Sequence, residues 1–482
     1  MNHKNDDDRT QDLINNNRFF SHILKYKVGY LSLILFLVLL VPAVCNFWQD
    51  KPIIMGVESY YHLSLAESAS WYNINYFPLK MINLFLVDSY LFLIPLFLAF
   101  ASLWIFLAFA KKVNISEKFT FFFAFFLVIN PAFIYTYITL STYSFLFFLL
   151  LLGFFLYSSK NKFFHYISLV PFLLSTFFDI FSGIILLLLF LVYLYLEKKK
   201  VKSLLKGFPG IVFVSTFILI FFNILTIKIP FVLGPFNLQD TIINLVSDLG
   251  GLSGTGIFIL FLALIGLAVA WKSKNYSFSY VFLLLFVPVY FYSSQTIFHL
   301  SLLITFFATV SFVSLFETNW NLELLKKFTF FLLILGILFS TLTYLDRVTE
   351  LGPSKSDFQT LTWIKDNVPG EKVVFSTPEN SYYITYFAKK TPLNLIGGSG
   401  NQEFNDNITD AIFASTYTTT TFPIFEENDI SIIYITEDIR NKYSAEQGLL
   451  FLLKNERFKL VHSHKSSEVW LFTKELAEIE ES

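Results

Sequence analysis

The feature that most constrains this chain is a series of long apolar stretches, each about as long as a membrane-spanning helix. A helix needs about 20 mostly apolar residues to cross about 30 Å of hydrocarbon, and inside lipid its backbone groups must be bonded within the helix. Eleven stretches of the 482 residues satisfy this requirement. They cover about 28–46, 89–110, 118–137, 142–158, 163–178, 180–196, 209–229, 255–271, 277–292, 296–316 and 327–345. The fifth and sixth stretches are divided only by Asp179, Ser182 and Gly183.

Composition agrees with a polytopic α-helical membrane protein. Only 15% of the residues are charged, whereas soluble domains average about 25%. The net charge is -1, which gives no indication of nucleic-acid binding. The single cysteine, Cys45, excludes an internal disulfide and a paired-cysteine metal motif.

Lysine and arginine predict the orientation, because cytoplasmic loops carry an excess of them. With the N-terminus in the cytoplasm, the cytoplasmic segments hold 19 of these residues and the opposite loops hold 3, namely Lys51, Lys80 and Lys228. We therefore predict a multi-pass plasma-membrane protein with a disordered cytoplasmic tail at 1–27. Its transmembrane domain covers 28–345, with external loops at 47–88 and 230–254. An odd number of spans places the C-terminus outside the cytoplasm.

From residue 346 to 482 the pattern changes to that of a soluble α/β domain. Charged and turn residues return, and short apolar strands alternate with amphipathic helices. We predict helices at 357–367 and 382–389, and strands at 372–376, 430–435 and 469–473. The predicted topology makes this domain extracytoplasmic.

The first external loop contains GVESYYHLSLAES at 56–68, in which Glu58 and His62 are four residues apart. On a helix this spacing places a carboxylate and an imidazole on one face, where they could share a divalent cation. The alternative is an interfacial amphipathic helix whose Tyr60, Tyr61 and Trp71 form an aromatic belt.

The second external loop contains NLVSDLGGLSGTG at 244–256, with Asp248 as its only acid. By itself this pattern predicts turn chemistry, in which Gly250 and Gly251 allow a positive φ and Asp248 caps a helix.

Around Glu58 the chain resembles the oligosaccharyltransferase catalytic-subunit family and its archaeal and bacterial relatives in the C-type (GT-C) glycosyltransferase superfamily. That family places an acid before Tyr-Tyr-His-Leu in its first external loop, and here Glu58 stands where Asp is usual. The resemblance implies that Glu58 binds a divalent cation and helps to engage the acceptor. Asp248 in VSDLGG looks like the acid of the family's later external loop, which also approaches the metal, so the resemblance implies a cation-binding role for Asp248. The segment WIKDNVPGEKVVFS at 363–376 resembles the start of the family's soluble domain.

Three departures argue against protein N-glycosylation itself. The external link at 139–143 has no acid, although the family uses a carboxylate pair there. The Trp-Trp-Asp-Tyr-Gly signature that reads the acceptor sequon is absent, and PENSYYITYFAKK at 378–390 is the comparable stretch. Eleven helices are also fewer than a full oligosaccharyltransferase has.

These observations predict a metal-assisted glycosyltransferase, which moves a sugar from a polyprenyl-phosphate or polyprenyl-diphosphate carrier to an extracytoplasmic glycan, lipid or protein. Mn²⁺ or Mg²⁺ suits the oxygen ligands. The predicted metal ligands are Glu58, Asp248 and His62, of which Glu58 and Asp248 are also the predicted catalytic acids. The predicted donor- and acceptor-binding residues are Tyr60, Tyr61, His62, Lys228 and His299.

Three alternatives stay open. An interfacial lysine at 228 could simply extend its amine toward water. The protein could be a non-catalytic relative that keeps the fold for assembly or binding. It could also be a lipid or glycan transporter or flippase, although ion-coupled transporters usually carry ionisable residues in mid-membrane and these spans hold almost none.

Overall fold

The computed structural model describes residues 18–68, 80, 90–159, 161–196, 208–226, 238–271, 277–292, 296–393, 409–415 and 417–473. The chain divides into two compact units. The first comprises Met1–Ala43 and Phe92–Val348, and the second comprises Val44–Leu91 and Thr349–Ser482. Residues from the first predicted loop therefore belong to the same unit as the C-terminal domain.

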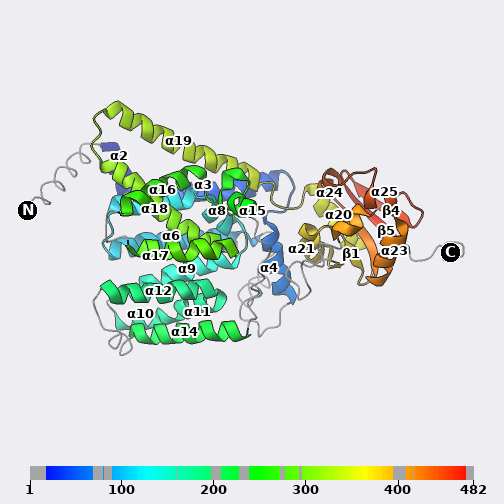
Figure 1. The fold of residues 1–482 in the computed structure, drawn as a ribbon, viewed down its shortest axis with the longest axis horizontal. Helices are drawn as coiled ribbons and strands as arrows, with labels where there is room; N and C mark the ends of the chain where they lie inside the picture. The colour runs from blue at the N-terminus through cyan, green and yellow to red at the C-terminus, as the bar shows by residue number, and fades with distance from the viewer. Residues whose placement is uncertain are drawn as a thin grey trace, which may run out of the picture. The chain divides into compact units, whose positions relative to one another are not determined.

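The first unit is built from α-helices (Figure 1). Their bounds are α2 (Arg18–Lys25), α3 (Lys27–Trp48, which continues into the second unit), α6 (Leu93–Lys112), α7 (Glu117–Ile129), α8 (Pro131–Ile138), α9 (Thr142–Tyr157), α10 (Lys162–Ile167), α11 (Leu169–Phe178), α12 (Ile180–Leu196), α14 (Phe208–Thr226), α15 (Leu238–Leu245), the 3-10 turn η2 (Ser247–Leu249), α16 (Ile257–Trp271), α17 (Ser277–Tyr292), α18 (Ile297–Glu317) and α19 (Glu323–Val348).

Length and composition identify membrane-spanning candidates among these helices. Within the described residues, α3, α6, α18 and α19 are each long and apolar enough to cross a bilayer, and the bent pair α7 and α8 makes a fifth candidate. Several further apolar helices, including α9, α16 and α17, are shorter. The predicted multi-pass helical architecture is confirmed, while the number of eleven spans stays a prediction.

The bend of 61° between α7 and α8 has a clear cause. Pro131 cannot donate a backbone hydrogen bond, so the helix is interrupted at Asn130. The Asn130 side chain donates to Thr305 Oγ1 at 3.0 Å, and Thr341 Oγ1 donates to the Ile129 carbonyl at 3.1 Å. Neighbouring helices thus satisfy polar groups at the break, which would otherwise cost several kcal/mol in lipid.

Close packing joins α16 to α18. A Cβ at Gly266 of α16 would lie 1.8 Å from the Phe307 carbonyl oxygen of α18, so only glycine fits there. Small residues that let two backbones approach are typical of helix pairs in membranes. This contact fixes α16, the helix that follows the Asp248 loop.

The second unit contains a five-stranded sheet in the order β2-β1-β3-β5-β4. Strands β1 (Val373–Phe375), β2 (Thr391–Pro392) and β3 (Ile430–Ile435) run parallel, while β5 (Ser467–Phe472) is antiparallel to both β3 and β4 (Phe458–His464). The unit also holds α4 (Val57–Ser68), α20 (Lys355–Asn367), η5 (Pro378–Asn380), α21 (Ser381–Tyr383), the π-helix η6 (Ile384–Ala388), α23 (Thr418–Glu427), α24 (Glu437–Lys442) and α25 (Gly448–Leu452). The predicted C-terminal α/β domain is confirmed, and its extracytoplasmic location stays a prediction.

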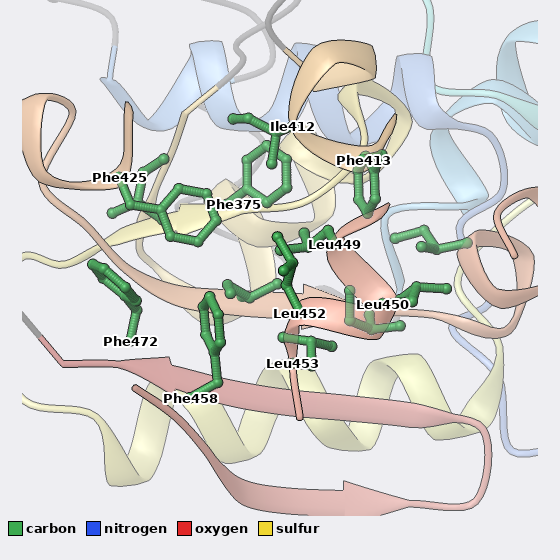
Figure 2. Packing of buried hydrophobic residues seen from close by; sticks show 14 residues of the cluster. Phe375, Ile412, Phe413, Phe425, Leu449, Leu450, Leu452, Leu453, Phe458 and Phe472 are labelled. Carbon is green, nitrogen blue, oxygen red and sulfur yellow. The ribbon is translucent and has the colours of Figure 1, made fainter. Parts of the chain in front are cut away.

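An apolar core covers one face of this sheet. Figure 2 shows Phe375, Phe425, Phe458 and Phe472 gathered there, with ring centroids 5.3 Å apart for the last two. On β3, Tyr434 points the other way and donates to Asp357 of α20 at 2.7 Å. Because side chains alternate along a strand, α20 covers the opposite face.

Candidate functional site

The helix α4 carries the first predicted motif and begins directly after Gly56, whose φ of 80° suits glycine. The Gly56 amide donates to the Leu351 carbonyl at 3.1 Å, and Ser59 Oγ donates to the Met55 carbonyl at 2.6 Å. Glu58 is exposed in the first turn, where the helix dipole favours a carboxylate. The helix start is therefore anchored while its acid stays accessible.

His62 lies one helical turn after Glu58, so the two side chains share a face of α4. Its ring centroid is 5.0 Å from that of Tyr61. Burial lowers the pKa of His62 to about 4. The imidazole is consequently neutral at neutral pH, which is the form that binds metals.

Tyrosines from the C-terminal part of the second unit pack against α4. The buried Tyr60 ring lies 5.2 Å from Tyr383, 5.4 Å from Tyr386 and 4.9 Å from Phe387. Its hydroxyl donates to the Ile54 carbonyl at 2.8 Å. Tyr60 thus packs α4 against the later residues of the same unit.

Two further contacts extend this packing. Tyr61 meets Tyr382 with ring centroids 4.9 Å apart, and Lys389 Nζ pairs with Glu67 Oε2 at 2.5 Å. These contacts with α4 come from the stretch at 378–390, the predicted counterpart of the sequon-reading signature. This role was not predicted from the sequence, although the run of aromatic residues in that stretch is a signal for such packing. Trp71 of the predicted belt lies outside the described residues.

Asp248 lies in η2, between α15 and α16. Gly250 takes a φ of 117°, and a Cβ at Gly251 would lie 2.6 Å from the Ile243 carbonyl oxygen. Asp248 Oδ2 accepts hydrogen bonds from the Ile257 amide at 2.7 Å and from Ser340 Oγ at 3.0 Å. The carboxylate therefore caps α16 and also joins this loop to α19.

The other oxygen of this carboxylate is available. Among the described residues, Asp248 Oδ1 accepts no hydrogen bond, and the residue is exposed. The capping role and a cation-binding role are thus compatible, because they use different oxygens.

His299 lies in the first turn of α18 and is 3% exposed. Its Nε2 is 3.2 Å from Asp179 Oδ2. Asp179 sits between α11 and α12, and the Ser182 amide and hydroxyl each donate to the same oxygen at 2.8 Å. The structure thus places His299 in a buried pair with an acid. Lys228, the other predicted carrier-binding residue, lies outside the described residues.

The predicted ligands divide between the two units. Glu58 and His62 are in the second unit and Asp248 is in the first. The described part of the chain contains no group of three or more His, Cys, Asp or Glu side chains that could hold a metal ion. The donors themselves suit one, since exposed carboxylate oxygens are ligands for Mg²⁺ and Mn²⁺, and the neutral imidazole favours Mn²⁺ over Mg²⁺.

Sequence comparison finds no match, either to a known protein family or to a curated protein. Solved structures do match. The oligosaccharyltransferase of Archaeoglobus fulgidus in its apo form superposes with a TM-score of 0.62 at 12% identity, covering 96% of this chain and 76% of that chain.

The same enzyme matches in two bound forms. With a tethered acceptor peptide containing the NVT sequon, the TM-score is 0.57 at 11% identity, covering 94% of this chain and 74% of that chain. A form with Zn and sulfate gives 0.55 at 12% identity, covering 92% and 72%. This chain therefore has the fold of an archaeal oligosaccharyltransferase, and the family resemblance expected from Glu58 and its neighbours is confirmed at the level of fold.

Proposed function

We propose that this protein is a membrane glycosyltransferase, which transfers a sugar from a polyprenyl-phosphate or polyprenyl-diphosphate carrier to an acceptor on the extracytoplasmic face. The observation that carries the proposal is Glu58, an exposed carboxylate on a firmly anchored helix start, within a chain whose fold matches an oligosaccharyltransferase over 96% of its length. A form of that neighbour holds a dolichol-phosphate and an inhibitory peptide. The proposed donor, with its polyprenyl-phosphate or polyprenyl-diphosphate carrier, agrees with the dolichol-phosphate in that complex.

In the proposed topology the N-terminus is cytoplasmic, eleven helices span the membrane and the sheet domain is outside. The excess of lysine and arginine in one set of loops supports this arrangement.

In the proposed mechanism Glu58 and His62 on α4 would hold a divalent cation, and Asp248 would offer its Oδ1 as a cation ligand. A bound Mg²⁺ or Mn²⁺ would neutralise the negative charge that develops on the departing phosphate. The Zn form of the neighbour supports a metal-dependent reaction of this kind. Glu58 is exposed, so its carboxylate can also accept the proton of an acceptor hydroxyl. Ser340 orients Asp248 by its hydrogen bond to Oδ2.

The acceptor is proposed to differ from an N-glycosylation sequon. The stretch at 378–390 lacks the sequon-reading signature, and its Tyr382, Tyr383 and Tyr386 are buried. Their rings pack against Tyr60 and Tyr61 of α4. Side chains used in this way are not displayed to a peptide.

One observation favours a second candidate, a transporter. Ion-coupled transporters often place ionisable residues at interrupted helices. Asp179 lies at the interruption between α11 and α12 and pairs with the buried His299. A transport function would require this pair and not Glu58.

The deciding experiment is mass spectrometry of carrier-linked saccharides and surface glycans. Four strains are compared: one with the wild-type protein, one without it, one with Glu58→Gln and one with the matched control Glu67→Gln. Glu67 is the other acid of α4, and its side chain pairs with Lys389. We expect the strain without the protein and the Glu58→Gln strain to lose a glycan and accumulate its carrier-linked precursor, while the control stays normal.

Unchanged glycans in the strain without the protein would refute glycosyl transfer. Normal transfer by Glu58→Gln would refute its catalytic role. Addition of EDTA to membranes tests the cation, and transfer that persists after EDTA treatment would exclude one.

A further inference from the structure

One face of α19 carries three polar side chains that hold the Asp248 loop. Ser340, Tyr344 and Arg347 are spaced by four and three residues, so they lie along one side of the helix. Ser340 Oγ donates to Asp248 Oδ2 at 3.0 Å, Tyr344 Oη to the Leu252 carbonyl at 2.5 Å, and Arg347 Nη2 to the Gly251 carbonyl at 3.3 Å. The end of α19 is thus built around this loop.

Arg347 has more hydrogen-bonding capacity than the loop uses. A guanidinium has five N–H donors. Among the described residues only Nη2 has a hydrogen bond, and Nε is buried with no partner. The side chain is partly exposed, and its Cζ lies 5.5 Å from the Tyr344 ring centroid. The aromatic ring and the Gly251 carbonyl hold the guanidinium in place while its remaining donors stay available.

The chemistry of these donors selects the ligand. A planar guanidinium binds phosphate oxygens through paired hydrogen bonds. The end of α19 carries a partial negative charge, and Asp346 is an exposed acid next to Arg347. Neither attracts an anion, so Arg347 is the group on this side of the loop that would hold one. Asp248 Oδ1, on the same loop, suits the cation that accompanies a phosphate.

We propose that Arg347 binds the phosphate of the polyprenyl carrier and positions it beside the Asp248 loop. This inference rests on the proposed function, because it takes the donor to be a polyprenyl phosphate. It assigns phosphate recognition to a residue outside the set of predicted site residues. The same chemistry would also hold the phosphate of an ordinary anionic phospholipid, so the test must separate these two sources.

The test measures binding of undecaprenyl phosphate to the full-length protein in nanodiscs of neutral lipid, by native mass spectrometry. Wild type is compared with Arg347→Gln, Arg347→Lys and the control Lys327→Gln. Lys327 is an exposed cation at the other end of α19, paired with Glu323. We expect Arg347→Gln to bind about 10–100-fold more weakly, Arg347→Lys to retain part of the affinity, and the control to match wild type.

Two competitors identify the ligand. Undecaprenol lacks the phosphate, and phosphatidylglycerol has a phosphate but no polyprenyl chain. The proposal holds if neither displaces undecaprenyl phosphate at equal concentration. Displacement by phosphatidylglycerol would overturn it in favour of a general lipid contact.

The outcomes also separate this inference from the proposed function. Wild-type protein that fails to bind undecaprenyl phosphate would overturn the donor class, and Arg347 would lose its role with it. Equal binding by wild type and Arg347→Gln would overturn only the role of Arg347. Unfolding midpoints measured for all variants exclude misfolding, and Arg347→Lys provides an independent readout if the glutamine variant is unstable.

Discussion

Acid should destabilise this protein through His62. Burial on α4 lowers the pKa of this imidazole from an ordinary value of 6.5 to about 4. The unfolded chain therefore takes up a proton first as the pH falls. Stability is complete above about pH 6.5 and decreases as the pH falls toward 4, because the unfolded state binds more protons in that window.

The size of the effect follows from the two pKa values. Each pKa unit corresponds to about 1.4 kcal/mol, so the complete loss near pH 4 is about 3 kcal/mol. At pH 5 the folded protein should already have lost about 2 kcal/mol through this one residue. A change of this size is a large part of the stability of a typical domain.

The assay compares unfolding of full-length wild type, His62→Gln and the control His22→Gln at pH 7.5 and pH 5. His22 is an exposed histidine of α2. We expect wild type and the control to lose stability on acidification, and His62→Gln to lose about 2 kcal/mol less. If all three proteins respond equally, His62 is not a buried neutral imidazole, and its assignment as a ready metal ligand fails with it.

Two further predictions concern the first unit. Ser340→Ala removes the hydroxyl that orients Asp248 and should lower sugar transfer about 10–100-fold, as is typical for residues that support a ligand; transfer at the wild-type rate would show that Asp248 needs no such support. Asp179→Ala leaves buried His299 without its acid and should reduce stability by about 3 kcal/mol. The double variant with His299→Phe should recover part of that loss in thermal unfolding, and no recovery would contradict a direct coupling of the pair.

The local pattern of the sequence was sufficient for the elements with a strong apolar signal. The strand predicted at 430–435 matches β3 residue for residue, because its β-branched isoleucines strongly favour a strand. The helix predicted at 382–389 is divided into α21 and the π-helix η6, and it ends where Lys389 adopts a φ of 51°. Sequence periodicity does not distinguish such a π-helix from an α-helix.

Other elements gave too weak a signal. Strand β4 was not predicted, since Lys459 and His462 interrupt its apolar residues. It lies at an edge of the sheet, where polar side chains face solvent. Strand β2 has only two residues, one of them Pro392. Its pairing with β1, and not its own sequence, makes it a strand.

For the candidate site, spacing along one helix was predictable and long-range contacts were not. The shared face of Glu58 and His62 follows from four-residue spacing on α4. The bond from Ser340 to Asp248 joins residues 92 positions apart, and no local pattern encodes it. The pairing of His299 with Asp179 was not predicted, because His299 lies in the apolar stretch at 296–316 and Asp179 lies at the division between two other stretches.

The packing of α4 against Tyr383 and Tyr386 affects how genetic data on this protein should be interpreted. Glu58 depends for its position on a segment more than 300 residues later in the chain. A substitution that only loosens the sheet domain should therefore abolish the proposed sugar transfer even when the altered residue contacts neither acceptor nor donor. Inactive alleles that map to the C-terminal region should be tested for protease resistance of α4 before they are assigned to substrate recognition.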